Sequence, residues 1–176
     1  SFLFFLPEME RLFQSSPTYR RSFIDRLIFS SRNDYNKVIN KYKKLLSERI
    51  KILQSHNIDN QWLNQVDKEI SKTGLDIYKS RYFQLNIINE TIKELSKSNK
   101  FRFNVELKIK DNFFKSTLNF EEYLMSLNES RHLDKLNGVS KIGPHRSDII
   151  AIIDNDYEAS LLSTGQQKTV VLMILL

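Results

Sequence analysis

The chain has 176 residues, a formal net charge of +6 at pH 7, three histidines and no cysteine. A chain without cysteine has neither a disulfide framework nor a thiolate metal site, and with so few histidines we predict no metal site. The positive charge is compatible with nucleic acid as a partner, but charge alone does not demonstrate that function.

The first elements expected are a strand and a helix. A continuous apolar run at residues 2–6 predicts a strand buried on both faces, and a short helix or turn should follow it. Ser16 then precedes Pro17, an order typical of a helix N-cap followed by proline at the first helical position. Arg20 and Arg21 lie on this helix, where they form either a solvated basic face or a surface with a binding task.

Residues 33–56 predict a long helix with an apolar stripe. Apolar side chains recur there at steps of three and four residues, a coiled-coil-like pattern. Basic residues outnumber acidic ones, and we weigh two interpretations of them: a solvated face, or a surface that faces DNA. The residues of the second interpretation are Lys37, Lys41, Lys44 and Arg49.

A second long helix is expected over residues 60–97, antiparallel to the first and capped by Asp59. Gly74 falls inside it, but the apolar pattern continues through the glycine without a change of phase. One helical glycine costs about 1 kcal/mol, which such a stripe can outweigh. Trp62 is expected to pack in the core.

The remaining middle of the chain alternates between strand and helix patterns. Apolar and polar residues alternate over 101–109, which predicts a half-buried strand. Asn119 and Glu122 form a capping-box pattern that opens a helix over 119–136. A hairpin follows over 149–161, with two strands joined by a turn.

The most informative stretch begins at Ser163, which precedes the apolar run 169–176 and predicts a turn that enters a helix. Ser163 can act as the N-cap, and Gln166, three residues later, completes a capping box. Gly165 leaves no side chain in the way of a ligand, and the helix start contributes N–H groups and a partial positive charge. The stretch is therefore either an ordinary cap or an anion site suited to a terminal phosphate.

Three motifs resemble those of the RecF family, which are ABC-type ATPases related to SMC proteins. The first is Ser163-Thr164-Gly165-Gln166-Gln167-Lys168, which is similar to the ABC signature motif in its RecF form. The second is Gly143-Pro144-His145-Arg146-Ser147-Asp148, and the third extends from Phe5 to Asp25. They occur in the family's order and are spread over nearly the whole chain.

The resemblance implies roles for some of these residues. In a RecF dimer the signature motif contacts the γ-phosphate of ATP held by the partner subunit's P-loop, with Mg²⁺ as the accompanying ion. In this chain the resemblance assigns the γ-phosphate contact to Ser163, Thr164, Gly165 and Gln166, and it includes Lys168 with a less defined role. The resemblance places Arg20 and Arg21 near the joint between lobes. It assigns no individual role to Gly143, Pro144, His145, Arg146 and Asp148.

Two patterns resemble catalytic motifs, but we do not interpret them as catalytic. Asp154 follows an apolar run as a Walker B acid does, but it precedes the signature motif, whereas the family's acidic strand follows it. His145 with Asp148 could form a catalytic pair, yet no nucleophile is associated with them, so a structural loop is favoured. The sequence also lacks the P-loop pattern Gly-x4-Gly-Lys-Ser/Thr.

The resemblance implies a fragment of a recombination mediator for DNA repair, replication-fork recovery and the SOS response. Such proteins bind single-stranded, double-stranded and gapped DNA, form ATP-dependent homodimers, work with other recombination mediator proteins and hydrolyse ATP slowly. We expect the P-loop before Ser1 and the acidic strand after Leu176. This chain should therefore contain no catalytic residue and should neither bind ATP tightly nor hydrolyse it alone.

The predicted fold is mainly α with short β segments: the coiled-coil-like helical lobe II of a RecF-like protein with part of an ABC-type head. Residues 1–30 would form the head's edge and the joint, 31–137 the helical lobe with its long antiparallel helix pair, and 138–176 the return to the head. The alternative is a helical coiled-coil interaction module with a basic face and no nucleotide site. It explains residues 33–97 but not the later motifs.

Neither apolar end of the sequence predicts a membrane segment. The run at 1–6 lacks the basic start and cleavage site of a signal peptide, and 169–176 is shorter than the roughly 20 residues that span a bilayer. We expect a cytoplasmic protein without a membrane partner.

Overall fold

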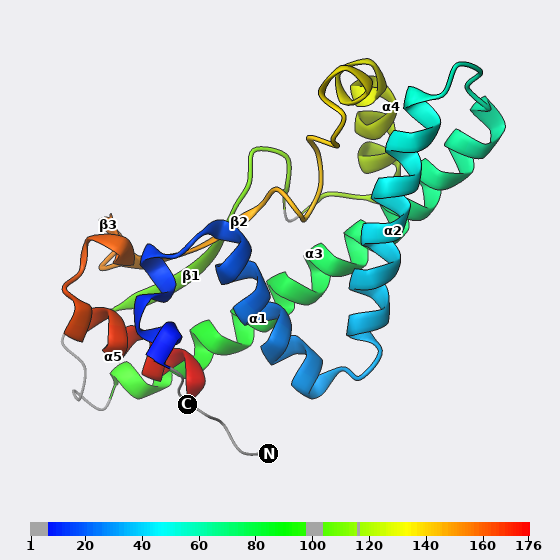
Figure 1. Ribbon diagram of the computed structural model, residues 1–176. Helices are drawn as coiled ribbons and strands as arrows, with labels where there is room; N and C mark the ends of the chain where they lie inside the picture. The colour runs from blue at the N-terminus through cyan, green and yellow to red at the C-terminus, as the bar shows by residue number, and fades with distance from the viewer. Residues whose placement is uncertain (1–6, 98–103, 116) are drawn as a thin grey trace. The chain divides into compact units, whose positions relative to one another are not determined.

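The computed structural model describes residues 7–97, 104–115 and 117–176 (Figure 1). Helices dominate this part of the chain, which confirms the predicted mainly α class. The elements are, in chain order, the 3-10 helix η1 (Pro7–Gln14), α1 (Pro17–Ser31), α2 (Tyr35–Gln54), α3 (Asn60–Ser96), β1 (Val105–Lys110), α4 (Phe120–Asn137), β2 (Asp148–Ile153), β3 (Tyr157–Glu158), the 3-10 helix η2 (Ala159–Leu161) and α5 (Thr164–Leu175).

The chain forms two compact units, each assembled from segments that are distant in sequence. The unit that we call the sheet unit takes its described residues from 1–27, 81–110 and 148–176. The helical unit consists of residues 28–80 and the described residues of 111–147. Helices α1 and α3 contribute to both units.

An antiparallel sheet of order β1-β2-β3 lies in the sheet unit. Val105 pairs with Ile153 at one end of the β1–β2 ladder, and Lys110 pairs with Asp148 at the other. The side chain of Asn89 on α3 bonds both backbone groups of Leu107, at 2.8 Å to its N–H and 3.0 Å to its carbonyl. This amide fixes the second half of α3 to the sheet.

The hairpin differs from the expected one in its second strand. Asp154 and Asn155 have positive φ angles of 50° and 60°, which is the geometry of a tight type I′ turn. The return strand ends at Glu158, and residues 159–161 form η2 instead of continuing the ladder. The prediction of a strand to residue 161 was therefore wrong, and the 159–161 turn leads the chain directly into α5.

Helix α5 packs against η1 within the sheet unit. Its apolar run is mostly buried, at Val170, Val171, Met173 and Ile174. Lys168 on α5 forms an ion pair with Glu10 on η1, with 2.6 Å between Nζ and Oε1. These contacts fix α5, and with it the turn at its N-terminus, against η1.

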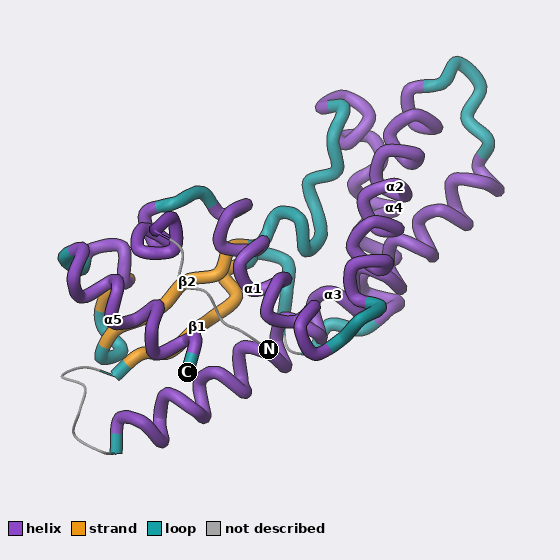
Figure 2. The backbone as a smooth tube through the Cα atoms, turned by 60° about the horizontal axis from the view of Figure 1, so that its bottom comes forward, coloured by secondary structure: helices purple, strands orange, loops and turns teal. Residues whose placement is uncertain are grey.

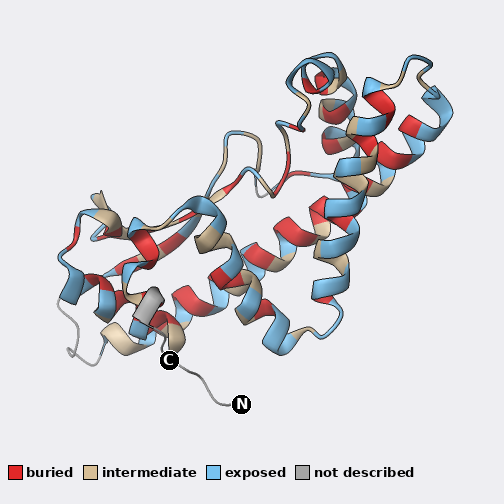
Figure 3. Ribbon diagram, in the orientation of Figure 1, coloured by how far each residue is buried: buried red, intermediate tan, exposed pale blue. Residues whose placement is uncertain are grey.

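In the helical unit, α2 and the first part of α3 form the predicted antiparallel pair. Cross-helix contacts run in opposite directions along the two sequences, from Glu48 with Trp62 to Lys41 with Glu69. Helix α4 lies beside α2 (Figure 2). Gly74 does not interrupt α3, and buried residues recur along this helix (Figure 3). The prediction of one long second helix is confirmed.

The predicted N-caps and the predicted core position of Trp62 are both tested by the structure. The N-caps predicted at Ser16, Asp59 and Asn119 all accept a hydrogen bond from a backbone N–H of the first helical turn. Trp62 was wrongly expected in the core, because its side chain is exposed and donates its indole N–H to Glu48 at 2.9 Å. The strand expected at residues 2–6 lies outside the described residues.

The strand expected at 101–109 is described only from residue 104 onward, and there it begins at Val105. Among the described residues, no helix combines the length and hydropathy needed to cross a membrane.

Candidate functional site

The turn at Ser163 forms the predicted capping box. The Ser163 hydroxyl accepts from the N–H of Gln166 at 3.4 Å, and the Gln166 side-chain oxygen accepts from the N–H of Ser163 at 3.0 Å. Within a helix the first N–H groups have no carbonyl partner, so those of Thr164 and Gly165 point out of the helix start. The sequence identified this local geometry correctly because the capping box depends only on neighbouring residues.

The four residues from Ser163 to Gln166 are all exposed. A Cβ atom built on Gly165 would have no atom within 4 Å, so packing inside the described chain does not require glycine there. The turn thus presents a hydroxyl, N–H groups and an unobstructed glycine at the positive end of a helix. Such an arrangement can bind an oxyanion.

Gln167 and Lys168, the next two residues of the motif, hold this turn in place through contacts with the rest of the sheet unit. Gln167 is fully buried, and its side-chain N–H₂ donates to the carbonyl of Leu162 at 2.9 Å and to that of Ser160 at 3.5 Å. Lys168 is engaged with Glu10, so its ammonium stabilises the contact between α5 and η1. Sequence reasoning missed the supporting role of Gln167, although the residue lies inside the motif.

The second motif is a tightly packed loop that begins at Gly143. Gly143 has a φ of +128°, and a Cβ atom there would lie 2.2 Å from the Tyr42 hydroxyl and 2.3 Å from the Tyr123 hydroxyl. Arg146 closes the turn by donating its backbone N–H to the Gly143 carbonyl at 2.8 Å. The Ser147 hydroxyl donates to the Pro144 carbonyl at 2.9 Å. Glycine is therefore required by both the backbone and the packing.

His145 connects this loop to α2 and to the segment that follows α4. Its Nε2 donates to the Ser140 carbonyl at 3.0 Å, and its Nδ1 accepts from the Tyr42 hydroxyl at 2.9 Å. The Tyr42 and Tyr123 hydroxyls lie 3.1 Å apart, and burial raises the pKa of Tyr123 well above its usual value. Both ring nitrogens of His145 are thus used for structure, which agrees with the structural interpretation of this loop.

Asp148, the last residue of the second motif, pairs with Arg20 of the third. Arg20 donates Nε and Nη2 to the two carboxylate oxygens at 2.8 and 2.7 Å, a bidentate geometry. Its Nη1 donates to the carbonyls of Phe13 and Ser15. The pair therefore connects α1 to the start of β2 inside the sheet unit. Both residues were identified in the sequence, but their pairing could not be predicted, because they are 128 positions apart.

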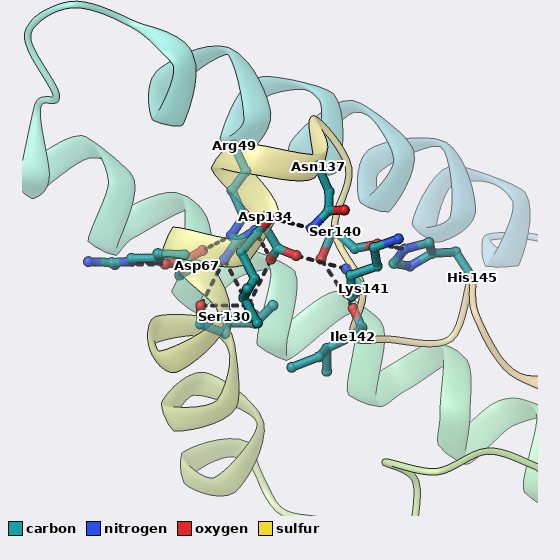
Figure 4. A network of polar contacts seen from close by, with 12 residues as sticks. Arg49, Asp67, Ser130, Asp134, Asn137, Ser140, Lys141, Ile142 and His145 are labelled. Carbon is teal, nitrogen blue, oxygen red and sulfur yellow. Dashed lines mark hydrogen bonds and ion pairs between the residues drawn. The ribbon is translucent and has the colours of Figure 1, made fainter.

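Arg49 lies in a buried network of charges (Figure 4). Its side chain is 0% exposed and donates at 2.6 Å to each of Asp67 and Asp134, and at 2.7 Å to the Leu127 carbonyl. Arg131 donates to the other oxygen of Asp67 at 2.7 Å. The placement of Arg49 on a DNA-facing surface was wrong, because this guanidinium is inaccessible to phosphate.

The other basic candidates remain at the surface. Lys37 and Lys44 on α2 are exposed, and Lys41 is exposed while paired with Glu69 at 2.5 Å. Contact with Lys41 lowers the pKa of Glu69 through their hydrogen bond. Arg21 donates to the Thr18 hydroxyl at 2.9 Å. In the part of the chain that is described, no group of three or more metal-ligating side chains could hold an ion.

The chain is similar to curated proteins that share one name. A protein of Rickettsia bellii named "DNA replication and repair protein RecF" is 30% identical over 182 residues, covering 100% of this chain and 50% of that protein. The Rickettsia typhi protein of the same name is 31% identical over the same shares. Along its whole length, the chain matches RecF. The resemblance predicted from the three motifs is therefore confirmed.

Solved RecF structures agree in fold. The structure described as "Structure of the recombination mediator protein RecF-ATP in RecFOR pathway" superposes with a TM-score of 0.80 at 23% identity, over 97% of this chain and 48% of that one. No protein-family model matches the chain. The chain spans about half the length of the curated RecF relatives that it matches.

Proposed function

We propose that the chain forms half of a RecF-type DNA repair and recombination protein, in which the turn from Ser163 to Gln166 contacts ATP bound by a second subunit. The observation that carries the proposal is the unobstructed, capped turn with open space over Gly165. The names of the relatives and the solved RecF-ATP structure support it. The rival helical module leaves this exposed glycine turn unexplained.

The residues present suit one end of a nucleotide and no more. The first N–H groups of α5 would donate to the terminal phosphate oxygens, and the Ser163 hydroxyl, which here donates to Gln166 Oε1 at 2.9 Å, would turn to the phosphate when ATP binds. Gln167 and Lys168 would keep the turn in position. Bound ATP with Mg²⁺ would supply the anionic charge that this helix start stabilises. The remaining phosphates and the metal require a P-loop, whose pattern is absent from this sequence.

DNA is the proposed macromolecular partner, together with a second subunit and other recombination mediators. Lys37 and Lys44 are exposed on α2 and can release counterions from phosphates when they dock. Slow ATP hydrolysis and a role in the SOS response would belong to the longer protein that joins this half to a P-loop. Within the present chain, the contributions are a phosphate-contacting turn and a basic helix.

The direct test replaces Ser163 by aspartate in a protein of RecF length that contains this chain. Aspartate is as good an N-cap as serine, so the free energy of unfolding should change by less than about 0.5 kcal/mol. Its carboxylate would face the phosphate, and loss of a charged hydrogen bond alone should weaken ATP-dependent dimerisation by about tenfold or more. Circular dichroism and sedimentation with and without ATP measure the two effects.

Ser163→Asn is the matched control, because asparagine also caps helices but adds no charge. It should dimerise more strongly with ATP than the aspartate variant does. If Ser163→Asp forms normal ATP-dependent dimers, Ser163 is a helix cap only and the proposed phosphate contact is wrong.

A further inference from the structure

A groove in the helical unit has no role in the function proposed above. It has a volume of about 350 Å³ and lies between α2 and the loop that follows α4. Leu46 and Ile50 line it from α2, and Val139 lines it from the loop. A site of this size can accommodate one large apolar side chain of a partner.

Positive charge borders this apolar surface. Lys51 and Arg146 line the groove, and none of its described lining residues is acidic. Neither cation has an ion pair within the described residues, in contrast to Arg20, Arg49 and Lys41, which all do. Two unpaired cations beside an apolar surface favour an acidic ligand that also carries an apolar group.

Exposed apolar residues continue beyond the groove. Val139 is 45% exposed, and Leu136 and Leu133 at the end of α4 are 71% and 58% exposed. Leu133 and Leu136 are three residues apart on the same helix, so they share a face. An exposed apolar face bordered by charge is typical of a surface that binds another protein.

The loop wall of the groove is preformed. The Asp134 carboxylate accepts the backbone N–H of Lys141 at 2.9 Å while its other oxygen binds Arg49, and His145 donates to the Ser140 carbonyl (Figure 4). The buried Asp134 carboxylate and the His145 ring therefore hold the loop at these two points. Binding to such a wall requires little ordering of the protein, which favours affinity.

We propose that this groove docks an acidic segment of a partner protein. One apolar side chain of the segment enters between Leu46, Ile50 and Val139, and its carboxylates bind Lys51 and Arg146. This assigns a task to Arg146, the exposed residue of the second motif. Nucleic acid fits the groove less well, because its apolar lining at Leu46, Ile50 and Val139 is aliphatic. The one aromatic ring among the described lining residues, His145, is bonded through both nitrogens to Ser140 and Tyr42.

The test selects a phage-displayed random dodecapeptide library on the purified 176-residue chain. Enriched peptides should combine aspartate or glutamate with leucine or phenylalanine. Their affinity, measured by fluorescence polarisation, should fall at least tenfold for the double variant Lys51→Glu, Arg146→Glu and for Val139→Asp. Lys68→Glu, an exposed charge reversal on α3, should change it less than twofold, and circular dichroism should show all variants folded.

Three results would overturn the proposal. The first is enrichment of peptides without acidic residues, or no enrichment over the Lys51→Glu, Arg146→Glu variant. The second is binding of acidic peptides that these substitutions leave unchanged. The third is that the oligonucleotide dT15 binds and the double variant abolishes its binding while no peptide is enriched, which would make the groove a nucleic-acid surface.

Discussion

Gly143 and Gly165 belong to two different motifs, and they differ in whether the packing around them requires glycine. Gly143 combines a φ of +128° with tyrosine hydroxyls that occupy the place of a Cβ atom, so the fold itself requires it. Gly165 has open space around it, so the fold does not. Both glycines were visible in the sequence, but only the packed loop shows which of them is structural.

Gly143→Ala should lower the free energy of unfolding by about 2–3 kcal/mol, because alanine is strained at this φ and displaces two buried tyrosines. Urea denaturation measures the loss. Gly165→Ala is the matched control and should remain within about 0.5 kcal/mol of the parent. Equal stabilities of the Gly143 variant and the parent would contradict the packing described for this loop.

Arg49→Met should destabilise the chain by about 3–5 kcal/mol, because it leaves Asp67 and Asp134 buried without their cation. Lys44→Met, on the same helix but exposed, should change the free energy of unfolding by less than about 0.5 kcal/mol. Thermal and urea unfolding of both variants test this difference. A stable Arg49→Met protein would mean that the carboxylates find other partners.

The burial of Arg49 could have been inferred in part from the sequence. It lies seven residues after Tyr42 and three before Ile52, which places it on the buried stripe of α2 and away from Lys37. Its partners could not be inferred, because Asp67 and Asp134 are 18 and 85 positions away. Periodicity assigns a face, whereas pairing across elements depends on tertiary packing.

At the scale of elements, α3 continues through Gly74, and the lack of a side chain at this position leaves room for two tyrosine rings. A Cβ atom at Gly74 would lie 2.7 Å from Cε1 of Tyr123 and 3.0 Å from Cε2 of Tyr42. The sequence predicted that the helix tolerates this glycine. It did not predict that the close packing of α2 and α4 on α3 needs it.

Gly74→Ala should therefore destabilise the chain by up to about 2 kcal/mol, even though alanine favours a helix by about 1 kcal/mol. The loss should shrink or reverse in a Tyr123→Leu background, where the opposing ring is absent. A double-mutant cycle by urea denaturation measures the coupling. A stabilising Gly74→Ala in the parent chain would show that the rings can move aside freely.

Elements with strong local signals were predicted well, and those decided by their surroundings were not. The long helices and their caps follow from periodicity and from residues within one turn. The return strand ended early because the Gln167 amide binds the carbonyls of Ser160 and Leu162, a contact from the next helix. Trp62 has an apolar ring at a helical position, but its indole N–H finds Glu48 at the surface.

At the scale of the molecule, the basic surface of α2 should bind DNA weakly and with strong dependence on salt. The double variant Lys37→Glu, Lys44→Glu should reduce binding of a gapped duplex by about tenfold or more and lower the salt slope by roughly 2. Lys68→Glu and Lys72→Glu together form the charge-matched control. Fluorescence anisotropy at several salt concentrations measures both quantities, and binding that ignores salt or the first pair would argue against this surface.

The central proposal is that the turn at Ser163 acts on ATP held by another subunit, and a mixing experiment tests it most directly. Two variants of the RecF-length protein are prepared, one with Ser163→Arg and one with its P-loop lysine replaced by alanine. Each homodimer lacks an intact site. A mixed dimer has one site that joins an unchanged P-loop to an unchanged Ser163 turn.

The measurement is ATP hydrolysis by the two variants separately and in an equimolar mixture. We predict that each variant alone is inactive and that the mixture regains part of the parent activity. A mixture that stays inactive, although sedimentation shows that the two variants associate, would contradict a turn that acts across the dimer.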